Sequence, residues 1–442
     1  MRVSTMAGAV AADRSERAAC PIPAALAQGG NRPLAVWPPR SAYLHIPFCH
    51  RRCFYCDFPV VPLGDRASAE AGAPGSRSME AYLEQLRAEI QGSAPGPPLS
   101  TVYIGGGTPS LLSAEQIQSL LQELEQRYGL AAGAEISLEL DPASFDETRL
   151  QGYLRAGINR VSLGGQSFDD AVLERLGRRH RRRDLLEAAR WLQRAQRSGQ
   201  LQSWSLDLIQ SLPGACLEHW RVQLQQAIDL APPHLSIYDL IIEPGTVFAR
   251  REASGELALP EDDLSADLLE LTVQRLALAG YGHYEISNYA LPGHASRHNR
   301  VYWSGAGWWG FGMGATAAPW GRRQARPRTR EGYAQWVQAS SEETAEQPSP
   351  MPFDERVMVG LRRREGVALA ALAQTHGVSC EQFRLLEQRL EGFLRRGLLR
   401  RQGRRWSLSD PEGLALSNAV LRELLDWWSE RPDCSEGLPP SL

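Results

Sequence analysis

Short runs of apolar and β-branched residues alternate along this chain with longer segments whose apolar residues recur every three or four positions. The short runs predict strands, and the longer segments predict amphipathic helices. Six predicted strands each precede a helical segment: YLHI at 43–46, TVYIGG at 101–106, EISLEL at 135–140, RVSLGG at 160–165, SLDLIQ at 205–210 and HLSIYDLII at 234–242.

Repeated strand–helix units of this kind predict a parallel sheet with right-handed crossovers. We therefore expect an α/β fold whose sheet curls into a partial (β/α)6 barrel, open because a closed barrel has eight units. Two helices stand out, one from Met79 and one that follows Ser113. Ser113 and Gln116 form a capping-box pattern, and Gly129 ends that helix.

Composition shifts predict five regions. Residues 1–40, rich in Ala, Gly and Pro without the apolar core of a signal peptide, are expected to be a disordered tail. The barrel core is expected at 41–245, an aromatic and β-rich extension at 246–339, and a polar linker at 340–352. The remainder, 353–430, predicts a winged-helix-like domain, with helices and a hairpin at 353–363, 368–376, 380–396, 398–409 (hairpin) and 413–428.

Composition also limits the function. The net charge is −3. The chain has no lysine, and this absence excludes a P-loop nucleotidase and a Schiff-base pyridoxal enzyme. No run of 18 apolar residues predicts a transmembrane helix. The seven cysteines are an odd number and too scattered for a disulfide framework. We expect a cytoplasmic protein, and a peripheral position at a membrane stays open.

The chemically distinctive residues follow the ends of the predicted strands, where barrels of this class carry their sites. A cysteine loop follows the first strand and GGGTPS (105–110) the second. Glu139 to Pro142 follow the third strand, GGQSFD (164–169) the fourth, and Asp207 lies within the fifth. The sequence therefore predicts one site at this edge of the sheet.

The cysteine loop, YLHIPFCHRRCFYCDF, places Cys49, Cys53 and Cys56 within eight residues. Two metal sites fit this spacing. A zinc site would need a fourth ligand, which His45 or His50 could supply. A [4Fe–4S] cluster normally takes four cysteines, so three would leave one iron open to a small ligand.

The C-x3-C-x2-C spacing, with YIGGGTPS, GGQSFDD and SLDLIQSLPG downstream, resembles the radical S-adenosylmethionine (radical SAM) superfamily and its coproporphyrinogen-dehydrogenase-like branch. The resemblance implies a [4Fe–4S] cluster on the three cysteines and SAM bound at its open iron. It implies SAM or cluster contacts from Tyr43, Gly106, Gly107, Thr108, Glu139, Gln166, Arg178 and Asp207. Taken singly, the glycines could form a tight turn, and the polar residues could be ordinary strand-end groups.

Within that branch, Phe58 stands where the oxygen-independent coproporphyrinogen III oxidases carry a fourth cysteine, and RHNRVYW (297–303) resembles the H-N-x-x-Y-W signature of the haem chaperones. The resemblance implies haem binding by His298, Tyr302 and Trp303, and delivery of haem to apo-haemoproteins such as respiratory cytochromes. The alternative is the oxidase, a SAM-dependent enzyme that decarboxylates coproporphyrinogen. A packed loop is the simpler explanation of His298, and His283, His294 or Tyr302 could ligate iron instead. A homodimer stays open.

Arginines cluster in the predicted hairpin, at 395, 396, 400, 401, 404 and 405. A winged-helix-like domain could use them to bind phosphates. Acidic helix faces and the acidic pI near 6.3 argue against this. We therefore expect no nucleic-acid partner.

Overall fold

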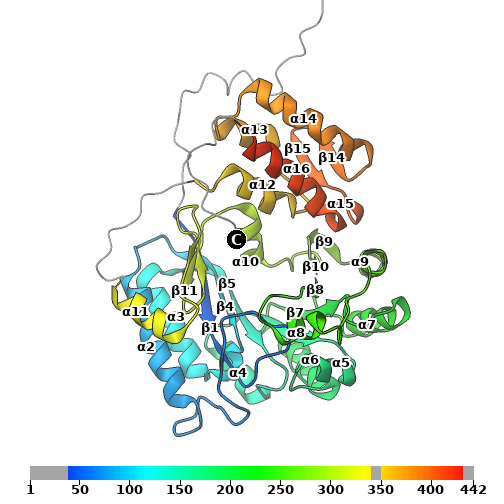
Figure 1. Cartoon of the computed structure of the whole chain (residues 1–442). Helices are drawn as coiled ribbons and strands as arrows, with labels where there is room; N and C mark the ends of the chain where they lie inside the picture. Colours follow the sequence, from blue (N-terminus) through cyan, green and yellow to red (C-terminus); the bar gives the residue numbers. More distant parts are fainter. Residues whose placement is uncertain (1–37, 340–349, 432–442) are drawn as a thin grey trace, which may run out of the picture.

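The computed structural model describes residues 38–339 and 350–431 (Figure 1). The predicted tail at 1–40, apart from its last three residues, and most of the linker predicted at 340–352 lie outside the described residues. A large sheet with its helices forms one part of the molecule, and a group of helices with one hairpin lies above it in Figure 1.

All six predicted core strands are present: β1 (Ser41–Ile46), β4 (Leu99–Gly106), β5 (Leu130–Leu140), β6 (Arg160–Gln166), β7 (Ser203–Gln210) and β8 (His234–Asp239). Each pairs in parallel with the next, as the alternation of strands and helices predicts. The last strand is shorter than predicted. It ends at Asp239 because Leu240 packs into a separate cluster with Phe248, and Ile241 is 67% exposed.

The segment after residue 245 lengthens the sheet at both edges. β11 (Trp309–Phe311) pairs in parallel with β1. At the other side, β10 (Asn288–Ala290) runs antiparallel to β8 and to β9 (Gly282–Glu285). The strand order is β11-β1-β4-β5-β6-β7-β8-β10-β9, so the predicted partial barrel is flanked by strands from its extension.

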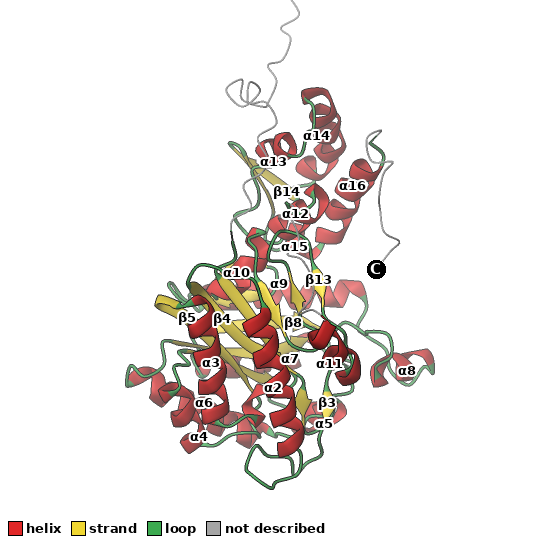
Figure 2. Cartoon of the chain, turned by 90° about the vertical axis from the view of Figure 1, so that its left-hand side faces the viewer, coloured by secondary structure: helices red, strands yellow, loops and turns green. Residues whose placement is uncertain are grey.

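Helices pack on the outer face of the sheet (Figure 2). They are α2 (Ser76–Gly92), α3 (Ala114–Tyr128), α4 (Glu147–Arg155), α5 (Asp170–Arg175), α6 (Arg182–Arg197) and α7 (Leu217–Asp229). The predicted capping box before α3 is confirmed, because Gln116 N donates to Ser113 Oγ and Ser113 N donates to Gln116 Oε1. Alternate strand residues such as Leu44, Ile104 and Leu206 are fully buried beneath these helices.

Further short elements complete the barrel and its extension. They are β2 (Phe48–Cys49), β3 (Val61–Pro62), η1 (Pro109–Leu111), α8 (Val247–Ala253), α9 (Asp262–Leu278), α10 (Arg297–Ser304), β12 (Thr316–Ala317), β13 (Gln324–Ala325) and α11 (Arg330–Ala339). α10 carries the H-N-x-x-Y-W signature.

The C-terminal residues form a second apolar core around Phe353, Phe383 and Trp406. The elements that enclose it are α12 (Phe353–Leu361), α13 (Leu369–Thr375), α14 (Cys380–Arg395), β14 (Leu399–Gln402), β15 (Arg405–Leu408), α15 (Glu412–Ala415) and α16 (Ser417–Ser429). They match the predicted helices and hairpin, except that the last predicted helix is broken at Leu416, whose φ and ψ of −98° and 21° leave the helical region. The winged-helix likeness stays a prediction.

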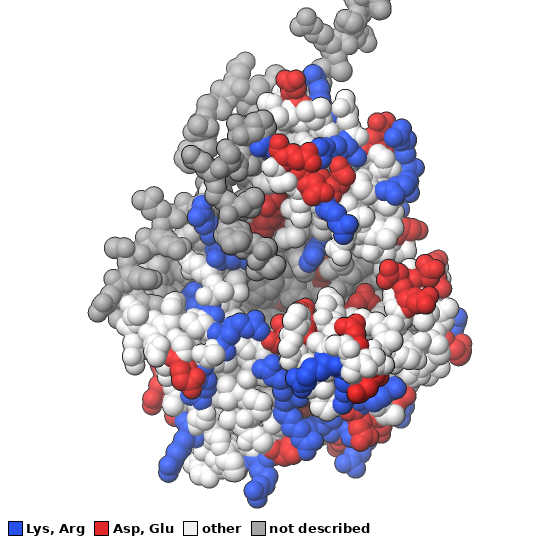
Figure 3. All heavy atoms as spheres, in the orientation of Figure 1, with Lys and Arg blue, Asp and Glu red and all other residues white. Residues whose placement is uncertain are grey.

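Acidic and basic side chains are interspersed on the visible face of this C-terminal group (Figure 3). Arg401 in the hairpin pairs with Glu387 at 2.9 Å, and Arg405 donates to the backbone oxygens of Glu365 and Gly366. Part of the arginine cluster is therefore engaged within the protein. The expectation of no nucleic-acid partner stays a prediction.

Backbone hydrogen bonds join the C-terminal group to the sheet edge. Ile286 N donates to Arg362 O at 3.1 Å, and Arg364 N donates to Tyr284 O at 3.2 Å. The group therefore docks against the β9–β10 side of the barrel. Throughout residues 38–339 and 350–431, every helix is too short or too polar to cross a bilayer.

A buried carboxylate on α2 joins the C-terminal part of the extension, residues 312–333, to the barrel. Glu89 accepts hydrogen bonds from Gly312 N, the Tyr333 hydroxyl and Arg326 Nε, each at 2.7 Å. The side chains of Glu89 and Arg326 are 5% and 11% exposed. A charge removed from such a site leaves its partner buried and unpaired.

We expect Glu89→Ala to lower the free energy of unfolding by about 3 kcal/mol, because Arg326 then lacks a counter-ion. The urea midpoint and the melting temperature should both fall. Glu84→Ala, at an exposed position of the same helix, is the matched control and should stay within about 0.5 kcal/mol of the parent. Equal stability of the two variants would contradict this account of Glu89.

Candidate functional site

The inner face of the curved sheet is polar, which is unusual because barrel interiors are mostly filled by branched apolar residues. Tyr103, Glu139, Ser162, Asp207 and Tyr238 line one pocket of about 370 Å³. The pocket lies where the core strands end, at the edge that the sequence predicts. Its lining contains most of the predicted site residues: Cys49, Cys53, Cys56, Gly106, Gly107, Thr108, Glu139, Gln166, Arg178 and Asp207.

The cysteine loop is held in place by backbone hydrogen bonds from three sides. Leu63 N donates to Cys49 O at 2.8 Å, and Thr108 N donates to Phe48 O at 2.7 Å. Phe54 N donates to Leu176 O at 3.0 Å. The positions of the three thiols are therefore set by neighbouring loops as well as by the loop itself.

The environment of the site raises the pKa of two of the three thiols. Burial raises the pKa of Cys49 to about 12, while a hydrogen bond from the Thr108 hydroxyl lowers it. Burial also raises the pKa of Cys56. Metal ligation requires thiolates, so a bound cation must displace these protons.

The arrangement suits a cluster better than a single ion. In the described part of the chain, no three Cys, His, Asp or Glu side chains converge closely enough to hold one metal ion. Thiolates of a cluster bind different irons, so they line a common space without meeting at one point. His45 is also engaged, with Nδ1 at 2.9 Å from the Tyr43 hydroxyl and Nε2 at 3.1 Å from Pro59 O. The zinc alternative with His45 as fourth ligand does not fit this geometry.

The glycine loop permits a close approach to the cysteine loop. A Cβ at Gly107 would lie 2.8 Å from Cys49 Sγ and 2.7 Å from Phe48 O. Gly106 N donates to Glu139 Oε2 at 2.9 Å. The sequence suggests that these glycines make room for a ligand, and the structure shows that Gly107 makes room for Cys49.

Two buried carboxylates share the pocket. Glu139 accepts from the Tyr103 hydroxyl at 2.9 Å, and burial raises the pKa of Glu139 to about 7. Asp207 accepts from Ser162 at 2.7 Å and from Ser205 at 2.8 Å, and burial raises its pKa too. Paired carboxylates in a low-dielectric pocket favour a cationic ligand.

Arg178 and Gln166 complete the pocket wall. Arg178 Nη2 donates to Asp141 Oδ2 at 2.6 Å, and Nη1 lies 3.5 Å from Cys53 Sγ. Gln166 has a φ of 64°, in the left-handed region, at a bulge of β6. Strained backbone of this kind gathers at functional sites.

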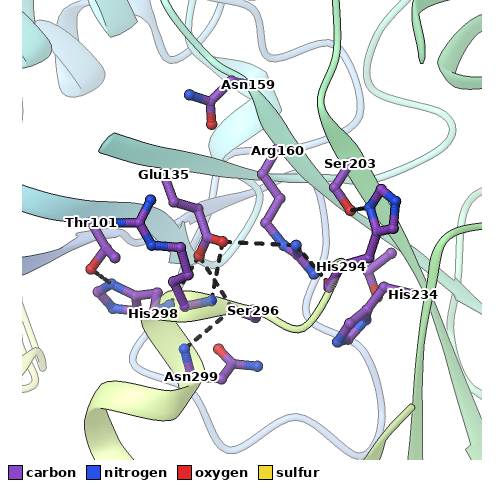
Figure 4. A network of polar contacts seen from close by, with 12 residues as sticks. Thr101, Glu135, Asn159, Arg160, Ser203, His234, His294, Ser296, His298 and Asn299 are labelled. Atoms are coloured by element: carbon purple, nitrogen blue, oxygen red, sulfur yellow. Dashed lines mark hydrogen bonds and ion pairs between the residues drawn. The ribbon is translucent and has the colours of Figure 1, made fainter. Parts of the chain in front are cut away.

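Four predicted residues lie outside this pocket. Tyr43 stacks on Tyr103 with ring centroids 6.2 Å apart. His298, Tyr302 and Trp303 lie on α10, near the ends at which the core strands begin (Figure 4). Apart from Tyr43, the structure thus separates the predicted SAM contacts from the predicted haem contacts.

His298 is fully buried and has partners at both ring nitrogens. Nδ1 lies 2.8 Å from Thr101 Oγ1, and Nε2 lies 2.8 Å from the Tyr302 hydroxyl. Burial lowers its pKa to about 3, so the ring is neutral. The ring also stacks on Tyr103, with centroids 5.2 Å apart. Ligation of iron by His298 requires the loss of one hydrogen bond.

The other candidate haem ligands near α10 differ in how their ring nitrogens are hydrogen-bonded. His283 Nδ1 lies 2.8 Å from Asp410 Oδ1, and its ring stacks on Tyr289. His294 Nδ1 lies 3.1 Å from Ser203 Oγ, and its Nε2 has no hydrogen-bond partner among the described residues. Trp303 is partly buried, with the Arg362 guanidinium 5.7 Å from its ring centroid.

A carboxylate from the barrel anchors the start of α10 (Figure 4). Glu135 accepts from Arg297 N at 3.1 Å and from His298 N at 2.9 Å. Arg160 lies 3.8 Å from the same carboxylate and donates to His294 O at 3.0 Å. Negative charge at a helix N-terminus is stabilising, so Glu135 fixes where α10 begins.

Glu135, Arg160 and Tyr103 were not predicted from the sequence, and Asp141 was predicted only as part of the segment 139–142. The signal for Tyr103 was present, because it lies two residues before Gly105 and so on the same strand face. Glu135 and Arg160 are the first residues of two predicted apolar strands, where a charged residue signals a buried partner. No local pattern could name that partner, because α10 is about 160 residues away.

Comparison with known proteins agrees with this arrangement. The family model of the radical SAM superfamily matches residues 43–215, and that of the HemN C-terminal domain matches 353–415. The chain is 41% identical over 412 residues to the heme chaperone HemW of Synechocystis sp., covering 87% of this chain and 96% of that protein. It is 36% identical over 401 residues to the heme chaperone HemW of Escherichia coli, covering 88% and 98%.

This chain belongs to the HemW family of the radical SAM superfamily. The predicted resemblance is therefore confirmed. A solved structure of the coproporphyrinogen III oxidase HemN from Escherichia coli is similar with a TM-score of 0.70 at 22% identity, covering 89% of this chain and 91% of that one. That likeness shows the fold. Membership of the superfamily implies a [4Fe–4S] cluster and SAM.

We expect SAM to bind more weakly as the pH falls below 7. If Glu139 binds the cationic groups of SAM, as the family resemblance implies, protons compete with the ligand, because burial raises the pKa of Glu139 to about 7. The affinity should fall about tenfold from about pH 7.5 to about pH 6, measured by equilibrium dialysis.

Glu139→Gln should bind SAM weakly at both pH values and lose this pH dependence. Glu147→Gln, on an exposed ion pair of α4, is the control and should behave as the parent. A pH profile of Glu139→Gln that matches the parent would show that another group titrates.

Proposed function

We propose that this chain is a haem chaperone: it binds haem and transfers it to apo-haemoproteins, with a three-cysteine [4Fe–4S] cluster and bound SAM. The observation that carries the proposal is the match, at 41% identity and over 96% of its length, to a protein named heme chaperone HemW. The α10 signature, intact and anchored, supports it.

At the cluster end, Cys49, Cys53 and Cys56 would each ligate one iron and leave the fourth for SAM. A bound cluster supplies one-electron chemistry at that open iron. Glu139 and Asp207 would bind the cationic and hydroxyl groups of SAM, and Gln166 would fix its orientation.

At the other end, α10 would supply the haem contacts. Neutral imidazole ligates iron well, and His298 is held neutral by burial. Tyr302 and Trp303 pack in one apolar cluster with Trp308, Met351 and Val359, which joins the extension to the C-terminal group. An apolar surface with a buried imidazole suits a macrocycle. Ligation of haem iron by His298 would cost one of its two hydrogen bonds, about 1 kcal/mol.

The division into a core at 41–245, an extension at 246–339 and a domain at 353–430 also stays a proposal. The two separate apolar cores support the boundary before 353–430, whereas the core and the extension share the larger of the two. We propose that the C-terminal group covers the α10 surface and meets the recipient, such as a respiratory cytochrome. A homodimer is compatible with this arrangement.

The oxidase is the alternative that the same barrel could serve. Phe58, 51% exposed, stands where that enzyme class carries its fourth cysteine, which weighs against it. The similarity to HemN concerns the fold alone. The two functions differ in one result, the turnover of coproporphyrinogen.

We expect reconstituted protein to bind haem with a new absorbance band, to pass haem to a haem-depleted cytochrome, and to leave coproporphyrinogen unchanged. His298→Ala should weaken haem binding at least tenfold, since even partners of metal ligands contribute that much. His219→Ala, a partly exposed histidine on α7, is the control.

His294→Ala removes the candidate ligand that precedes α10, and this variant should retain haem. Loss of haem from that variant, with binding by His298→Ala intact, would contradict the assignment of His298. Coproporphyrinogen turnover with consumption of SAM would overturn delivery as the function.

A further inference from the structure

A cation lies directly against one of the three cysteines. Arg178 Nη1 is 3.5 Å from Cys53 Sγ, and the side chain of Arg178 is only 11% exposed. The neighbouring residue, Arg179, also lines the pocket, but its Nε lies 3.8 Å from Oδ1 of the exposed Asp65. Arg178 is therefore a buried charge aimed at a thiol.

The loop that carries Arg178 is built onto the cysteine loop. Leu176 O accepts from Phe54 N at 3.0 Å. A Cβ at Gly177 would lie 3.0 Å from the Phe54 ring, so only glycine allows this contact, and Gly177 has a φ of 76°. Phe54 O in turn accepts from Phe248 N at 3.0 Å. The distance between Arg178 and Cys53 is thus fixed by backbone contacts.

A buried carboxylate holds the guanidinium in this position. Asp141 Oδ2 accepts from Arg178 Nη2 at 2.6 Å, and Gly164 O accepts from the same nitrogen at 3.0 Å. Although burial raises the pKa of Asp141, Arg178 lowers it well below its usual value. Asp141 is therefore an anion beside the cysteine site at any working pH.

Arg178 has one further hydrogen-bond donor that can contact a ligand. Its Nε is buried and has no hydrogen-bond partner among the described residues. That donor stays available to the carboxylate of SAM, which the family resemblance assigns to Arg178. Contact with Cys53 and contact with SAM therefore do not exclude each other.

We propose that Arg178 and Asp141 set the reduction potential of the cluster in opposite directions, Arg178 through its contact with Cys53 and Asp141 by opposing and orienting that charge. The inference rests on the proposed function only in requiring a cluster on the three cysteines. Reduction adds one electron to the cluster and breaks no bond. A cation at a ligating sulfur favours the reduced form, and a nearby anion disfavours it.

The test is a redox titration of reconstituted full-length protein without SAM, with dithionite as the reductant and dye mediators, followed by electron paramagnetic resonance. We expect Arg178→Gln to lower the ratio of reduced to oxidised cluster about tenfold at a fixed potential, equal to ~59 mV for one electron. Asp141→Asn should raise that ratio. Arg178→Lys, which keeps the charge, should restore much of the parent value, and Arg179→Gln should leave it unchanged.

Shifts of Arg178→Gln and Asp141→Asn in the same direction, or no larger than that of Arg179→Gln, would overturn the proposal. An effect that appears only after SAM is added would also overturn it, because Arg178 would then serve SAM alone. If Arg178→Gln takes up no iron, the reduction potential of Asp141→Asn tests the proposal instead, because that variant keeps the Arg178 guanidinium beside Cys53. Iron and sulfide analysis of the parent comes first: a parent without a cluster contradicts the proposed function, whereas a parent cluster with unshifted variants contradicts this inference alone.

Discussion

The burial of a polar inner sheet face is the constraint on which the rest of this structure depends. Every carboxylate and hydroxyl that points into the barrel needs a partner there, because an unpaired buried polar group is costly. Near the C-terminal ends of the strands, Tyr103 bonds to Glu139, and two serines bond to Asp207, leaving lone pairs that face a pocket. Near the opposite ends, backbone N–H groups of α10 bond to Glu135. The barrel is therefore open to ligands at one end and closed by its own extension at the other.

The extension does more than close the barrel. It adds one strand at one side of the core sheet and two at the other, and it is tied to α2 through Glu89. It also carries α10 and meets the C-terminal group through backbone bonds at Arg362 and Arg364. A segment with so many separate attachments holds α10 in one position relative to the pocket, although the two are far apart in sequence.

Much of the core could be predicted from the sequence because its signals are local. Period-two strands, the capping box at Ser113 and the spacing of the three cysteines each occupy a short window. The edge strands could not be predicted, since β9, β10 and β11 have only three or four residues each and are defined by pairing with distant strands. The predicted SAM contacts, except Tyr43, lie together because they follow successive parallel strands. His298 follows none of them, and its position depends on Thr101 and Glu135, which no pattern around residue 298 reveals.

One aromatic ring lies between the pocket and α10. Tyr103 lines the pocket on one side, and on the other its ring stacks against His298 at 5.2 Å. A smaller side chain at this position would lose both the hydrogen bond to Glu139 and the stacking on His298. A change at residue 103 would therefore alter the pocket wall and the packing of His298 at the same time.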